Sequence, residues 1–197
     1  MANLEKKNVC SPLLLAIQLI ICLLVAFRVE GHLLLALFSL YFFYKYDILP
    51  YCHFKEFPQF LKSFSLFILV LFLTLLISKL LLGDFSEQAI VNQSRSFTIE
   101  NNLREIFSIC IISPILEELF FRFAFYRSLK HYLGFFLSIL VTSFIFSVIH
   151  SNVLAMPALF ILGFYLNFTF LRFQNILYPI ALHILFNSIM LFFIMNK

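Results

Sequence analysis

The sequence predicts an all-α protein, a polytopic transmembrane helix bundle of about seven spans. Of its 197 residues, 62% are hydrophobic, 19% aromatic and only 12% charged, whereas a soluble domain is about 45–50% apolar and about 25% charged. The mean hydropathy is +1.00. A helix needs roughly 20 residues to cross the hydrocarbon, so the chain has room for about six or seven spans. These values argue against a soluble enzyme, a disordered regulator and a nucleic-acid-binding protein.

The apolar runs justify the expected helices in chain order. They lie at about 13–27, 32–44, 64–82, 106–126, 132–150, 153–171 and 176–195. The first two are short for full spans, so they are expected to be tilted or to form a tight hairpin around Arg28–Gly31, while the other five are long enough to cross. Two polar connections stand between the runs: Lys45–Ser63, with Pro50 and Pro58 as helix breakers, and Asp84–Glu105, with four acidic residues.

The positive charges predict an orientation in the membrane. With the N-terminus inside, eight Lys or Arg residues fall in inner segments and four in outer segments, which predicts a cytoplasmic N-terminus and an outer C-terminus. The run that follows Lys6 and Lys7 lacks a small-residue cleavage pattern, so it is expected to be a retained span. The chain is therefore expected to be a multi-pass integral membrane protein, in the plasma membrane if the host is bacterial. Its basic residues form no patch, so no nucleic acid is expected as a partner.

Two adjacent carboxylates lie where a membrane helix should carry none. Glu117 and Glu118 are about eleven residues into the run 106–126, or about 16 Å deep at helical rise. Arg122 follows Glu118 by four positions, which permits an ion pair between them. Adjacent helix positions point about 100° apart, so one arginine cannot easily pair with both carboxylates. Pro114 lacks an N–H, so it is expected to free a backbone carbonyl one turn back and to kink the helix.

Two later spans supply polar partners for these carboxylates. The fifth run contains Phe146-Ser-Val-Ile-His150, and the seventh contains His183-Ile-Leu-Phe-Asn187. The i,i+4 spacing places both side chains of each pair on one helix face. His183 and Asn187 are expected near the depth of Glu117, whereas His150 falls at the outer end of its span. A single membrane histidine is more often a packing or hydrogen-bonding residue, but these groups together can line one polar pocket.

This set of side chains permits two chemistries. A carboxylate beside a neutral imidazole can deprotonate a water molecule, while a second histidine and an asparagine amide can stabilise the oxyanion of a peptide under attack. Alternatively, Glu117, His150 and His183 form a two-histidine, one-carboxylate ligand set for a divalent ion such as zinc, with a position open for water. The types of residue allow both, so the cofactor, if any, stays open.

The three motifs, in this order, resemble those of the CPBP family of intramembrane proteases. Residues 117–122 match EExxxR, residues 146–150 match FxxxH, and residues 183–187 match HxxxN. The family includes type II CAAX prenyl endopeptidases and bacteriocin-processing or immunity proteins. The resemblance covers about residues 105–190, and the preceding region is recognised only as membrane spans.

The resemblance implies a role for each motif residue. Glu117 would activate the water, aided by His150, and His183 and Asn187 would stabilise the oxyanion. Glu118 and Arg122 would support the pocket, and the family pattern leaves metal assistance open.

The expected function is an intramembrane endopeptidase acting on a membrane-associated or prenylated-type peptide or protein at the bilayer. Two alternatives are a non-proteolytic immunity or signalling-scaffold protein of the same fold and a proton-coupled carrier, although the chain lacks the internal repeat typical of carriers. We expect two regions: residues 1–104, with about three spans and connecting loops, and residues 105–197, a helix core that carries the three motifs.

Overall fold

The structure is a computed structural model that describes residues 11–26, 31–45, 56–82, 99–153 and 155–195. All regular secondary structure in these residues is helical, which confirms the all-α prediction. The N-terminal helices are α1 (Pro12–Ala26), α2 (Gly31–Lys45) and α3 (Phe57–Leu82). A long helical stretch follows, made of α5 (Ile99–Phe107), the π-helical η2 (Ser108–Ile112), α6 (Ser113–Glu118), the π-helical η3 (Leu119–Phe125) and α7 (Tyr126–Ile149). The last two helices are α8 (Met156–Phe173) and α9 (Leu177–Met195).

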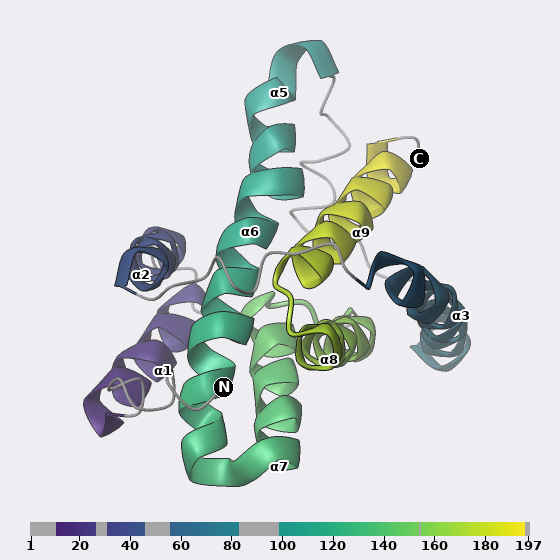
Figure 1. Ribbon diagram of the computed structural model, residues 1–197. Helices are drawn as coiled ribbons and strands as arrows, with labels where there is room; N and C mark the ends of the chain where they lie inside the picture. The colour runs from purple at the N-terminus through teal and green to yellow at the C-terminus, as the bar shows by residue number, and fades with distance from the viewer. Residues whose placement is uncertain (1–10, 27–30, 46–55, 83–98, 154, 196–197) are drawn as a thin grey trace.

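Figure 1 shows the long stretch folded into a hairpin, with α6 and η3 in one arm and α7 in the other. The helical backbone angles of α7 are interrupted at Gly134, which has a φ of 74° and a ψ of −174°. Residues other than glycine rarely adopt these backbone angles. Helix α8 packs along α7, and α3 packs on α8. Helices α1 and α2 pack against the opposite side of the hairpin, while α9 contacts η2, α6 and α8.

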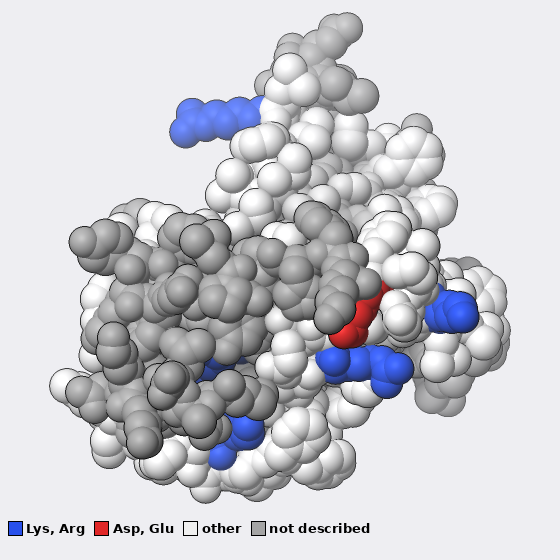
Figure 2. Space-filling view, in the orientation of Figure 1, with Lys and Arg blue, Asp and Glu red and all other residues white. Residues whose placement is uncertain are grey.

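The core between these helices is rich in phenylalanine. Phe120, Phe121, Phe125 and Phe146 are fully buried, and the rings of Phe121 and Phe146 meet edge to face at 5.4 Å. Other large apolar side chains point outward, as expected where lipid replaces water at the surface. On the part of the face in Figure 2 that is not grey, charged side chains are few, and an acidic group lies beside a basic one within a surface that is mostly uncharged.

Two helix starts differ from the sequence-based boundaries. Helix α3 begins at Phe57, inside the expected connection Lys45–Ser63, and Pro58 lies in its first turn. Proline is compatible with the first turn because its missing N–H has no partner there within the helix, so the expectation of a breaker at Pro58 was wrong. Helix α5 likewise begins at Ile99, within the expected connection Asp84–Glu105. The rest of both connections, residues 46–55 and 83–98, lies outside the described residues.

The prediction of about seven spans is not confirmed. Among the described residues, two helical stretches are long and apolar enough to cross a membrane: Leu103–Ile149, with 47 residues, and Met156–Phe173, with 18 residues. The apolar helical segments Pro12–Val25, Phe57–Leu69 and Leu177–Phe193 are shorter. The first of the two stretches contains two of the expected spans, and the helical backbone angles are interrupted at Gly134, near the start of the second. Half of the twelve Lys and Arg residues that predict the orientation lie outside the described ranges, and the orientation stays a prediction.

Candidate functional site

Glu118 is the centre of a fully buried polar cluster. Its Oε2 atom accepts a hydrogen bond from Arg122 Nε at 2.9 Å, and its Oε1 atom accepts one from Arg122 Nη2 at 3.3 Å. Both side chains are 0% exposed, so the predicted i,i+4 ion pair is present and is shielded from solvent. Oε1 also lies 3.0 Å from His183 Nδ1, which ties α9 to the EExxxR motif. Removing one partner of such a buried pair leaves an uncompensated charge.

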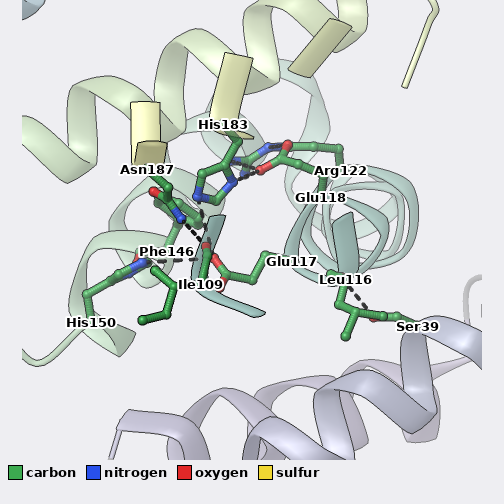
Figure 3. Close-up of polar contacts among 10 residues, drawn as sticks. All are labelled: Ser39, Ile109, Leu116, Glu117, Glu118, Arg122, Phe146, His150, His183 and Asn187. Atoms are coloured by element: carbon green, nitrogen blue, oxygen red, sulfur yellow. Dashed lines mark hydrogen bonds and ion pairs between the residues drawn. The ribbon is translucent and has the colours of Figure 1, made fainter. Parts of the chain in front are cut away.

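Glu117 is turned about 100° from Glu118 around the same helix and lies near the other ring nitrogen of His183. Its Oε2 atom lies 3.9 Å from His150 Nε2 and 3.9 Å from His183 Nε2, and it accepts no hydrogen bond among the described residues. Figure 3 shows the two imidazoles converging on this carboxylate from α7 and α9. Both separations are too long for a direct hydrogen bond, and polar groups at such a distance can be bridged by water. The cluster thus brings together the two glutamates, the arginine and both histidines that the sequence singled out.

The hydrogen-bond partners assign the tautomers of both histidines. His150 Nδ1 lies 2.7 Å from the carbonyl oxygen of Phe146, which can only accept, so Nδ1 carries the hydrogen. His183 Nδ1 faces the Glu118 carboxylate, which is already paired with Arg122, so this nitrogen is the donor as well. In the neutral form, each ring therefore directs the lone pair of Nε2 toward Glu117.

The site opens on the side of His150. This residue follows directly after α7, with φ −73° and ψ −7°, and the next residue, Ser151, has a positive φ of 50°. The His150 side chain is 29% exposed, against 12% for Glu117 and 1% for His183. The shallow position expected for His150 is thus the open end of the cluster, and α7 ends at Ile149 instead of continuing past it.

Asn187 lies one turn beyond His183 on α9, and its Nδ2 atom donates to the backbone carbonyl of Ile109 at 3.0 Å. One of the two amide hydrogens is therefore engaged by the protein, which leaves the second for another acceptor. The contact also connects α9 with η2, the π-helical turn before the glutamates. The sequence placed Asn187 near the cluster but predicted no backbone partner for it.

Two supporting residues were missed as such by the sequence analysis. The Phe146 ring lies 4.8 Å from the His150 ring, 5.6 Å from the His183 ring and 4.9 Å from the Arg122 guanidinium carbon. Its place in the FxxxH motif was a signal, although no role followed from it. The Ser39 hydroxyl of α2 lies 2.9 Å from the carbonyl oxygen of Leu116, the residue before Glu117. Nothing in the sequence around Ser39 signals this contact, because 77 residues separate the partners.

The cluster does not form a metal-ligand set. In the part of the chain that the structure describes, no group of three or more His, Cys, Asp or Glu side chains is placed to hold a metal ion. Around tetrahedral zinc, bonds of about 2.0–2.2 Å would put neighbouring ligand atoms about 3.3–3.6 Å apart, which is less than the 3.9 Å from Glu117 Oε2 to the Nε2 atom of either imidazole. The alternative of a metalloprotease-like site, in which Glu117, His150 and His183 hold a divalent ion, is therefore not supported by the described residues.

Comparisons with known proteins match the segment that carries the cluster. A family model described as type II CAAX prenyl endopeptidase Rce1-like matches residues 99–189. A Bacillus subtilis (strain 168) protein named "Putative membrane peptidase YdiL" is 32% identical over 78 residues, which are 40% of this chain and 32% of that protein. The chain thus matches about a third of the length of this curated relative. No solved structure matches the chain.

The family match and the name of the relative agree with the family that the three ordered motifs resemble. The matched residues 99–189 run from α5 to α9 and include both glutamates, both histidines and Asn187. Residues 99–189 of this chain are therefore similar to the Rce1-like family, in line with the resemblance that the three motifs indicate.

Proposed function

We propose that the protein is an intramembrane endopeptidase that hydrolyses a peptide bond of a membrane-associated or prenylated-type substrate with a water molecule activated by Glu117 and His150. The observation that carries the proposal is the Glu117 Oε2 atom, which lies 3.9 Å from two imidazole nitrogens and has no hydrogen-bond partner among the described residues. A buried carboxylate oxygen without a partner is costly, and a water molecule between these three atoms would satisfy it.

The reaction follows from these donors and acceptors. The water donates one hydrogen to Glu117 Oε2 and the other to His150 Nε2, so its lone pair is free to attack the scissile carbonyl carbon. As the C–O bond forms, one proton passes to Glu117 and the carbonyl oxygen becomes an oxyanion. The same proton is then delivered to the leaving amine as the C–N bond breaks. No protein nucleophile is needed.

The oxyanion is stabilised from α9. The second amide hydrogen of Asn187 is available for it, because only one is used by the Ile109 carbonyl. His183 Nε2 becomes a donor only when the ring carries a second proton, since Nδ1–H is already directed at Glu118. Preorganised donors of this kind act strongly where water is excluded, and the Glu118–Arg122 pair keeps the His183 ring in place.

The test compares membranes from cells that carry the wild-type protein or Glu117→Gln. New peptide termini that need Glu117 identify the substrate, and a peptide across the cleaved bond then serves for kinetics with purified protein in detergent. We expect Glu117→Gln and His150→Ala to lower kcat about 10²–10⁴-fold, the range for loss of general base catalysis. Glu105→Gln is the matched control, because Glu105 is an exposed carboxylate on α5, outside the cluster.

Two results would overturn the proposal. Cleavage, or the cellular phenotype, that persists in folded Glu117→Gln and His150→Ala proteins would favour a binding or scaffold role. A membrane peptide profile identical in wild type and Glu117→Gln would do the same. Elemental analysis of the active protein tests the route without a metal, for which we expect activity at well under one metal ion per chain.

A further inference from the structure

The carbonyl oxygen of Ile109 has lost its helical donor. In a regular α-helix it would accept from the N–H of Ser113, four residues later. In η2, however, the Ser113 N–H donates to the carbonyl of Ser108, five residues earlier. In that wider pattern the next N–H, that of residue 114, would serve the Ile109 carbonyl, but residue 114 is a proline and has no N–H.

This finding refines the expected effect of Pro114. Ile112 and Ser113 keep helical backbone angles (φ −68°, ψ −49° and φ −56°, ψ −52°), so the backbone angles there do not break. Instead, the π turn and the proline act together. The turn moves the Ser113 donor to Ser108, and the proline removes the only other donor that the helix could offer to Ile109.

The free carbonyl is satisfied by another helix. Asn187 Nδ2 donates to it at 3.0 Å across 78 residues of sequence. A backbone carbonyl without a hydrogen-bond donor is energetically unfavourable in a membrane. This bond therefore satisfies the Ile109 carbonyl and also restrains the asparagine side chain. On α9 the bond lies one turn from the His183–Glu118 contact, so the two contacts together orient α9 against the glutamates.

We propose that Pro114 is a positioning residue for Asn187: by leaving the Ile109 carbonyl without a helical donor, it provides the acceptor that fixes the orientation of the asparagine amide beside Glu117. Pro114 itself is three residues before Glu117 and touches no reacting atom in this scheme. The effect on catalysis rests on the proposed function, whereas the effect on the Asn187–Ile109 bond does not.

The test is a double-mutant cycle with Pro114→Ala and Asn187→Ala in the full chain. Alanine at position 114 supplies an N–H that can donate to the Ile109 carbonyl in the π pattern, and if the turn relaxes to the α pattern, this carbonyl accepts from the Ser113 N–H instead. We expect Asn187→Ala alone to lower Tm, because it leaves this carbonyl unpaired. In the Pro114→Ala background, Asn187→Ala should lower Tm by less than about half of its effect in the wild-type protein. The reason is that the Ile109 carbonyl then keeps a helical donor, so the two substitutions are coupled and their effects are not additive.

Activity supplies the second readout. With the substrate peptide, Pro114→Ala should lower kcat about tenfold with little change in KM, since a looser amide weakens stabilisation of the transition state more than binding of the ground state. Pro157→Ala is the control for removing a helical proline: Pro157 is exposed in the first turn of α8, where its N–H would have no helical partner. It should show no coupling to Asn187→Ala.

The outcomes separate the two proposals. Additive Tm changes in the Pro114→Ala and Asn187→Ala cycle would overturn the positioning role, even if Glu117→Gln abolishes cleavage. Coupled Tm changes in a protein whose cleavage survives Glu117→Gln would support the positioning of Asn187 while the proposed function fails. If Pro114→Ala does not fold, Pro114→Ser introduces the same N–H and completes the cycle.

Discussion

Gly163→Ala tests whether the close contact between α7 and α8 keeps the Phe146 ring in place against the two histidines of the site. A Cβ atom at position 163 would lie 3.0 Å from Cδ1 of Phe146, 3.3 Å from Cα of Ser143 and 3.4 Å from its carbonyl oxygen. The two Ser143 atoms belong to the backbone of α7, so they cannot move unless the helix moves with them. The Phe146 ring is therefore the group that must move, and it contacts both His150 and His183.

The expected loss of stability is small. Overpacking of a tight core costs about 1–3 kcal/mol, while alanine in a helix gains about 1 kcal/mol over glycine. The free energy of unfolding should therefore fall by about 0–2 kcal/mol. The effect on activity should be larger, because a displacement of 1 Å at a catalytic group can cost about 10² in rate. A shift of a few tenths of an ångström predicts a loss of kcat of about tenfold.

The assay combines denaturation with cleavage of the substrate peptide. Phe146→Leu, which removes the ring, should make Gly163→Ala less harmful, with a coupling of about 0.5–2 kcal/mol in the double mutant. Gly134→Ala is the matched control: no atom lies within 4 Å of its added Cβ, but its φ of +74° strains any side chain. It should lower stability and leave kcat of the folded protein unchanged. An unchanged kcat in Gly163→Ala would refute the idea that the contact between α7 and α8 positions the Phe146 ring. Equal losses of kcat in Gly163→Ala and Gly134→Ala would refute it as well.

Two further predictions concern groups that support the site. Arg122→Met should lower the free energy of unfolding by about 3–5 kcal/mol, because the buried Glu118 carboxylate loses its cation. Adding Glu118→Gln removes the unpaired charge and should restore most of this stability. A double mutant that is no more stable than Arg122→Met in the same denaturation assay would contradict the explanation. Ser39→Ala should cost about 0.6 kcal/mol, the mean for hydrogen bonds between membrane helices, since the hydroxyl also reaches the Leu35 carbonyl of its own helix at 2.7 Å. Ser65→Ala, which removes an exposed hydroxyl bonded within α3, is the control for Ser39 and should change stability less.

Local features of the site could be predicted from the sequence because helix geometry determines them. The Glu118–Arg122 pair follows from the i,i+4 rule, and the divergence of Glu117 from Glu118 follows from the 100° turn per residue. The all-α class follows from hydropathy, because a membrane helix satisfies its own backbone. None of these features depends on how two distant helices cross.

The contacts between helices could not be predicted in this way. The sequence placed His150 at the end of a span, but only the packing of α7 against η3 and α8 decided that the His150 Nε2 atom lies near Glu117. The Ile109 partner of Asn187 depends on a π turn, which hydropathy does not signal. The number of spans stays a prediction, because apolar runs indicate which residues can leave water but do not establish which helices cross the membrane.

By itself, the sequence determined that this is a helical membrane protein with buried glutamates, histidines and an asparagine in an order typical of one peptidase family. The tertiary structure decided which atoms meet: Glu118 with Arg122 and His183 on the closed side, Glu117 with His150 on the open side, and Asn187 with a carbonyl that Pro114 leaves free. The physical reason is that residue type and helical periodicity are local properties of the chain, whereas the depth, rotation and crossing of packed helices depend on side chains from every element at once.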